Sequence, residues 1–115
     1  MRAIKIDPEK CSLKLIDIEP GEVANALGTE LIDTIDFEKD HCLVIDDGGR
    51  AYVHSTCFRF AKDSRPFFGP VLILGLENGN WVSATLKIAE LKSNIIWEEW
   101  DACTEQYAEV LAATN

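Results

Sequence analysis

The sequence predicts an α+β domain: a mostly antiparallel sheet of five to seven strands, one short helix at about residues 22–27 and one long C-terminal helix at about 95–113. Two observations indicate the sheet. Apolar and polar residues alternate along several short segments, and turn-forming pairs such as Asp-Pro and Asn-Gly separate these segments. The helices follow from a spacing of three and four residues. A chain of 115 residues fits a single domain over 1–115.

The first segments of the chain are predicted to form a β-hairpin followed by a short helix. Residues 1–6 and 12–18 alternate, with an Asp-Pro turn between them. Gly28 suits the left-handed position that closes a helix over 22–27. Apolar spacing of four would also allow this helix to continue, but the β-branched content of residues 31–35 favours a strand there.

Two further strand pairs are predicted in the middle of the chain. Residues 41–45 form a short buried strand, and an Asp-Asp-Gly-Gly turn leads into a strand over 50–60. Residues 71–74 are apolar on both faces, as in a central strand. After an Asn-Gly turn, residues 81–88 give the clearest two-residue alternation, so a hairpin is expected over 71–88.

The C-terminus is predicted to be helical because Ile96, Trp100, Cys103, Tyr107 and Val110 are spaced by four and three residues. Asn94 would be the N-cap of this helix. The apolar stripe would pack on the sheet, or it would also form the seam of a homodimer.

The charge of the chain is concentrated in one segment. The net charge is −9, and residues 15–49 hold ten acids and one lysine, which accounts for all of it. Such a chain repels nucleic acids and anionic membranes and is attracted to basic surfaces. Direct binding to nucleic acid or to a membrane is therefore not expected, whereas a protein partner with a basic surface is.

Within this segment, an acidic surface is the candidate partner-binding site. Asp36, Glu38 and Asp40 lie two residues apart, so in an extended chain they would project from one side about 7 Å from one another. Such a row could imitate a nucleic-acid backbone, or it could simply keep a sheet edge solvated and free of aggregation. The residues of the candidate surface are Glu30, Asp33, Asp36, Glu38, Asp40, Asp46 and Asp47.

No motif for catalysis, a cofactor or a metal is found in the sequence, so we expect a protein that is not an enzyme. Gly69 precedes a proline and a strand, which excludes a phosphate-binding loop. His54 and Cys57 would lie on opposite faces of a strand, which argues against a catalytic pair. The four cysteines lack metal-site spacing and are expected to be reduced and mostly buried.

A second hypothesis is a domain that binds or sequesters a small molecule or nucleotide without catalysis. Its pocket would be lined by Tyr52, His54, Phe58, Arg59 and Trp81. The chain has no apolar run of the ~20 residues that a membrane span requires, and no apolar leader, so a cytoplasmic location is expected.

Several short segments resemble an uncharacterised small domain family of phages and other mobile elements. They are Ile4-Lys-Ile-Asp-Pro8, the helix ending in Gly28, Leu43-Val-Ile-Asp-Asp-Gly48 and Phe68-Gly-Pro-Val-Leu-Ile-Leu-Gly75. The resemblance covers about residues 1–75. It implies no known activity, but it implies a mobile-element setting, in which small acidic proteins often bind and inhibit host defence proteins, in the cytoplasm of the host cell.

Overall fold

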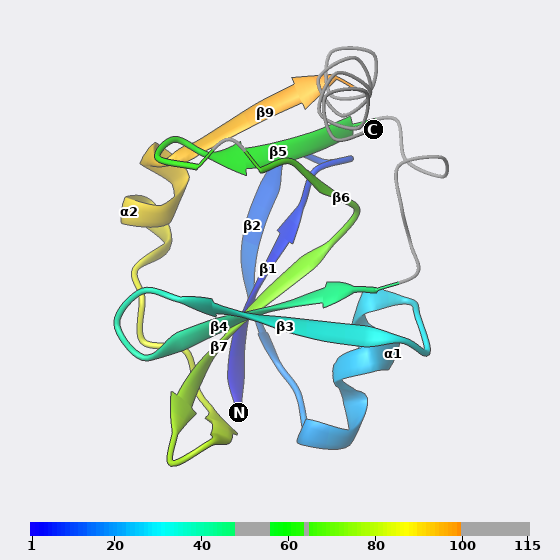
Figure 1. Cartoon of the computed structure of the whole chain (residues 1–115), viewed down its shortest axis with the longest axis vertical. Helices are drawn as coiled ribbons and strands as arrows, with labels where there is room; N and C mark the ends of the chain where they lie inside the picture. The colour runs from blue at the N-terminus through cyan, green and yellow to red at the C-terminus, as the bar shows by residue number, and fades with distance from the viewer. Residues whose placement is uncertain (48–55, 64, 100–115) are drawn as a thin grey trace, which may run out of the picture.

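The computed structural model describes residues 1–47, 56–63 and 65–99, and its strands form two antiparallel sheets (Figure 1). The strands are β1 (Arg2–Asp7), β2 (Ser12–Asp17), β3 (Ile32–Phe37), β4 (His41–Asp46), β5 (Thr56–Phe60), β6 (Phe67–Phe68), β7 (Val71–Glu77), β8 (Asn80–Val82) and β9 (Ile95–Glu99). The larger sheet has the order β2-β1-β7-β4-β3, with β8 also paired to β7, and the smaller has the order β6-β5-β9. Two short helices, α1 (Val23–Leu27) and α2 (Ile88–Ser93), and a 3-10 turn (Pro20–Glu22) complete the described part.

Two of the predicted hairpins and the first helix are confirmed: β1 pairs with β2, and β7 with β8, both antiparallel. The predicted hairpin of residues 41–45 with the strand over 50–60 is wrong, because β4 pairs with β3 and β7, whereas β5, the described part of that strand, pairs with β6 and β9 in the other sheet. Helix α1 ends at Gly28, whose φ of 73° places it in the left-handed region, and its N–H bonds back to Ala24 and Asn25. β7 lies in the centre of the larger sheet and is buried from Val71 to Gly75, as its uninterrupted apolar sequence indicates.

The main core lies between the two sheets. Ile4, Ile73 and Leu43 of the larger sheet pack against Phe58 and Phe67 of the smaller sheet. The ring centroids of Phe58 and Phe67 are 5.4 Å apart in a stacked arrangement. Figure 1 shows β5 and β9 crossing above the larger sheet, with α2 at one side.

A second core covers the opposite face of the larger sheet. Val23 and Leu27 of α1 pack there against Val44, Leu72 and Leu74. The central strands are therefore apolar on both faces because each face has a separate layer to contact.

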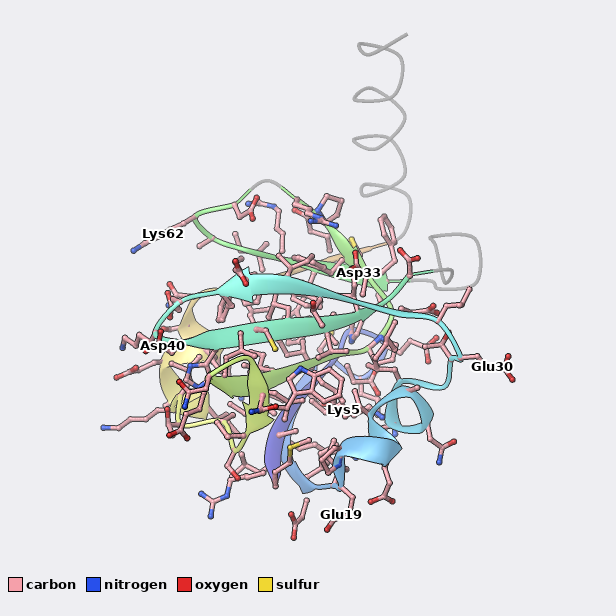
Figure 2. All side chains as sticks on the ribbon, turned by 60° about the horizontal axis from the view of Figure 1, so that its bottom comes forward. Lys5, Glu19, Glu30, Asp33, Asp40 and Lys62 are labelled. Carbon is pink, nitrogen blue, oxygen red and sulfur yellow. The ribbon has the colours of Figure 1, made fainter. Side chains whose placement is uncertain are left out.

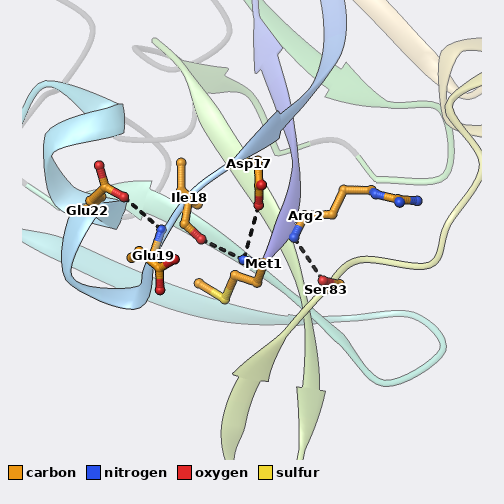
Figure 3. A network of polar contacts seen from close by, with 7 residues as sticks. All are labelled: Met1, Arg2, Asp17, Ile18, Glu19, Glu22 and Ser83. Carbon is orange, nitrogen blue, oxygen red and sulfur yellow. Dashed lines mark hydrogen bonds and ion pairs between the residues drawn. The ribbon is translucent and has the colours of Figure 1, made fainter.

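The first residues of the chain are fixed by polar contacts (Figure 3). The amino group of Met1 donates to the carbonyl of Ile18 at 2.8 Å and lies 3.3 Å from the carboxylate of Asp17. The N–H of Arg2 donates to the hydroxyl of Ser83 at 2.8 Å. These bonds join β1 to β2 and to the segment after β8.

The prediction of one long C-terminal helix at about 95–113 is wrong. Ile95–Glu99 form strand β9, which pairs with β5, and the remainder of that range lies outside the described residues. Asn94 is the C-cap of α2 instead of an N-cap. The β-branched and aromatic residues Ile95, Ile96 and Trp97 favour a strand, and Phe58 faces Trp97 across the pair. Most residues of the predicted dimer seam, Trp100, Cys103, Tyr107 and Val110, lie outside the described residues, so the homodimer stays a prediction.

The predicted strand over 81–88 is also shorter than expected. β8 ends at Val82, and helix α2 begins at Ile88. The alternation of burial does continue, with Ala84 buried between exposed neighbours. However, the N–H groups of Ala84 and Thr85 bond to the carbonyl of Arg2 and the ring of His41 instead of to a neighbouring strand. Alternation thus predicted which side chains are buried, but not the hydrogen-bond partner.

The cysteines differ from the expectation of four reduced thiols. Cys57 is disulfide-bonded, Cys11 and Cys42 are free, and Cys103 lies outside the described residues. Cys57 sits on a strand, as predicted, and its disulfide removes it as a nucleophile. None of the helices in the described ranges is long and apolar enough to span a membrane.

Candidate functional site

Among the strands that the structure describes, β3 lies at the edge of the larger sheet and has β4 as its single neighbour. The N–H of Asp47 bonds to the carbonyl of Leu31 at 3.0 Å, so residues 31 and 47 form a hydrogen-bonded pair. Hydrogen-bonded and non-bonded pairs alternate along an antiparallel ladder. The backbone groups of Ile32, Thr34 and Asp36 therefore point away from β4, toward the open edge.

The side chains of β3 divide between the two faces of the sheet. Ile35 and Phe37 pack into the core between the sheets, whereas Ile32 packs into the core on the opposite face. By alternation, Asp33 shares the face of Ile35, and Asp36 shares the face of Ile32. Both aspartates are exposed, so each face of this edge carries one carboxylate.

The expected extended row of Asp36, Glu38 and Asp40 does not form. β3 ends at Phe37, and residues 38–40 make the turn to β4, with positive φ at Lys39 (53°) and Asp40 (58°). The chain reverses there, so the three carboxylates are not on one line. Figure 2 shows Glu30 and Asp40 at opposite ends of the β3 strand.

Two of the seven predicted acids lie across from the start of β3. Asp46 pairs with Ile32 in the ladder and accepts a hydrogen bond of 2.9 Å from the hydroxyl of Thr29. Asp47 follows β4 and is exposed. The structure therefore distributes the acids along β3 and around both of its ends.

A cavity of about 180 Å³ opens beside β3, between this strand and residues 61–63 and 65. Its apolar walls are Ile35, Phe37, Leu43, Phe60, Phe67 and Leu91. The rings of Phe37 and Phe60 lie 4.9 Å apart and join the two sheets at this point. Exposed charged residues surround the mouth: Asp36 and Glu38 on one side, and Lys62, Asp63 and Arg65 on the other.

A second hollow of about 240 Å³ continues along the same strand. It is lined by Asp33, Asp46 and Asp47 and shares Arg65 and Phe67 with the first cavity. The guanidinium of Arg65 lies 5.4 Å from the ring centre of Phe67, and both residues line the two hollows. The edge strand is thus bordered along its length by hollows with apolar walls and acidic residues.

The three described residues of the predicted small-molecule pocket, Phe58, Arg59 and Trp81, are not brought together. Phe58 is fully buried between the sheets, whereas Trp81 packs on the opposite face of the larger sheet. Arg59 pairs with Glu98 through a 2.7 Å contact that joins β5 to β9. Tyr52 and His54 lie outside the described residues.

His41 is a buried histidine with both ring nitrogens hydrogen-bonded. Its side chain is 3 % exposed, and its Nδ1 donates to the carbonyl of Lys39 at 2.7 Å. Its Nε2 accepts the N–H of Thr85 at 3.0 Å. The position of His41 directly before the apolar run Cys42–Ile45 was the sequence signal for this role.

Cys42 lies opposite Asp36 in the ladder and faces the second core. Burial raises the pKa of its thiol, and the nearby carboxylate of Asp36 adds to this effect, while a contact with Trp81 partly opposes it. The thiol is thus held in its protonated form, and it acts as a small apolar group in the core.

Comparison of the chain with protein-family models, with curated proteins and with solved structures found no match. The resemblance to a mobile-element family therefore stays a prediction.

Proposed function

We propose that this chain is a protein-binding module that holds a basic segment of a partner protein along β3. The observation that carries this proposal is that an open sheet edge, with exposed carboxylates on both faces, borders a cavity with apolar walls. Leu31, just before β3, is 63 % exposed and adds apolar surface to the same edge.

The charge distribution supports a basic partner. Glu30, Asp33, Asp36 and Glu38 lie within nine residues, and Lys39 is the one base between residues 15 and 49. An acidic surface attracts a basic partner at long range and repels nucleic acid. Proteins that bind nucleic acid carry such basic surfaces, so we propose that the partner belongs to this class and that its activity is inhibited when the surface is covered.

The size of the cavity favours a protein partner over a free small molecule. Pockets for small molecules have volumes of about 300–1,000 Å³. The cavity beside β3 has a volume of about 180 Å³ and suits one side chain. Uptake of a side chain also fits its position directly beside an open strand edge.

Selection from a display library of random heptapeptides tests the proposal. We expect the selected peptides to be rich in Lys and Arg, and their affinity to fall with added salt. Asp36→Lys should lower the affinity about tenfold, because it replaces attraction by repulsion at the edge. Glu9→Lys makes the same change of net charge at the β1–β2 turn and should leave the affinity within about twofold. A selected pool without basic residues, or equal effects of the two variants, would contradict the proposal.

A further inference from the structure

We infer that the partner segment binds as an additional β-strand on β3 and inserts one large apolar side chain into the cavity of about 180 Å³ beside that strand. This inference rests on the proposed function and specifies the conformation and sequence pattern of the partner. An extended segment that joins an open sheet edge gains affinity from backbone bonds and specificity from side-chain pockets.

The backbone of β3 offers hydrogen-bond donors and acceptors to a partner strand. Ile32, Thr34 and Asp36 direct their N–H and C=O groups away from β4. The N–H of Thr34 is bonded to the carboxylate of Asp33 within the strand, at 2.8 Å. The partner strand therefore first contacts the outward N–H and C=O groups of Ile32 and Asp36. A carbonyl of the partner then replaces the Asp33 carboxylate as the acceptor of the Thr34 N–H.

The two faces of β3 predict different side chains in the partner. Residues of the added strand that point toward the smaller sheet enter the cavity below β3, whose apolar walls, Ile35, Phe37 and Phe60 among them, favour an apolar residue. Residues that point to the other face lie beside Asp36 and away from this loop. The partner segment therefore alternates between apolar residues and Lys or Arg.

The volume of the cavity indicates the size of the apolar residue. An apolar cavity of about 150 Å³ accepts a benzene molecule. The cavity beside β3 is about 180 Å³, and Phe37, Phe60 and Phe67 are among its walls. A phenylalanine or leucine of the partner fits this space and contacts aromatic rings on several sides.

Other occupants of the edge are disfavoured by charge. A second copy of the chain would bring its own Asp33 and Asp36 against these residues, and like charges across a strand pair are destabilising. Residues 100–115 of the same chain include three acids and no Lys or Arg, so they lack the complementary charge. A basic, extended segment of another protein is the occupant that fits.

The test measures the affinity of three capped heptapeptides for the full chain by fluorescence anisotropy. The first alternates as Lys-Val-Lys-Phe-Lys-Val-Lys, the second has the same residues with the lysines grouped, and the third is the first with N-methyl groups on alternate amides. We expect the first to bind at least tenfold more tightly than the other two. Each peptide is measured with the wild type and with three variants. Thr34→Pro removes an outward N–H, Ala61→Trp fills the cavity from its rim, and Leu15→Pro is the control.

Leu15 is a matched control because it has an outward-facing backbone on β2, the opposite edge of the same sheet. We expect Thr34→Pro and Ala61→Trp each to weaken the alternating peptide at least tenfold and Leu15→Pro to leave it unchanged. Equal affinity for all three peptides, with Asp36→Lys still weakening each, would overturn strand addition and leave the proposed function in place. Absence of saturable binding by any basic peptide would overturn both. The N-methylated peptide decides the result if Thr34→Pro does not fold.

Discussion

The N–H of Thr34 donates a hydrogen bond of 2.8 Å to the carboxylate of Asp33, at the open edge of the larger sheet. An exposed edge strand is a site at which further chains can pair, and proteins commonly protect such edges with charged residues. Here the carboxylate of Asp33 accepts the hydrogen bond of the outward N–H of Thr34 and also gives the edge a negative charge. Under the proposed function, the same residue protects the edge from other copies of the chain and attracts a basic partner.

Removing this protection should promote self-association. We expect Asp33→Ala to expose the N–H of Thr34 and to reduce the repulsion between edges, so that the variant forms dimers or larger species at concentrations where the wild type is monomeric. Sedimentation velocity measures the distribution. Glu9→Ala, which removes an acid at the β1–β2 turn, is the control. Identical sedimentation of the Asp33→Ala variant and the wild type would show that Asp33 does not protect the edge.

His41 should be a major contributor to stability. Removing its buried ring breaks the partly buried bonds to the N–H of Thr85 and the carbonyl of Lys39, and each lost hydrogen bond costs about 0.5–1.5 kcal/mol. We expect His41→Ala to lose at least this much unfolding free energy in urea, whereas Lys39→Ala, at an exposed side chain, should change little. Nitrogen NMR should also find the proton on Nδ1, and a proton on Nε2 would contradict the assigned bonds.

Cys42 should make stability fall at alkaline pH. Burial, with Asp36 adding to it, raises the pKa of the folded thiol above its ordinary value of 9.0. The folded state therefore holds the proton more tightly than the unfolded state, so this contribution is complete below pH 9.0 and is lost as the pH rises through the folded pKa. Urea unfolding should show a steeper alkaline loss for the wild type than for Cys42→Ala. Iodoacetamide should modify the exposed Cys11 first, and rapid modification of Cys42 would contradict its burial.

Gly75 should not tolerate a side chain. A Cβ atom at this position would lie 2.7 Å from the carbonyl oxygen of Ser83 and 3.0 Å from a methyl group of Val82. Because the first of these atoms belongs to the backbone, we expect Gly75→Ala to destabilise the fold by about 1–3 kcal/mol. Gly21→Ala is the control, since no atom lies within 4 Å of its Cβ position. Equal melting temperatures of the two variants would contradict the close approach of residue 83.

Local sequence signals predicted the elements whose partners are adjacent in the chain. The Asp-Pro and Asn-Gly turns marked the β1–β2 and β7–β8 hairpins, and Gly28 marked the end of α1. The prediction for the C-terminal segment failed because Ile95–Glu99 pair with β5, a strand about 40 residues earlier in the chain. Pairing with such a distant strand decides whether the segment forms a helix or a strand.

The candidate site was predicted only in part. Charge density drew attention to the acidic residues of β3, and an edge strand was one of the two interpretations of their pattern. The turn at residues 38–40 was missed because it contains no glycine, and its positive φ angles fall on Lys39 and Asp40. The cavity was missed because its walls come from β3, β4, β5, β6 and α2, and no local sequence pattern relates the β3–β4 pair to β5, β6 and α2.

Amide hydrogen exchange of the chain, measured by NMR with and without the alternating basic peptide, shows whether a partner strand pairs with β3. Ile32 and Asp36 point their N–H groups to the open edge, whereas Asp33 and Ile35 already bond to β4. We expect the peptide to slow exchange at residues 32 and 36 at least tenfold and to leave residues 33 and 35 nearly unchanged. Protection that is absent from β3, or equal at all four residues, would contradict the binding of a partner strand at this edge.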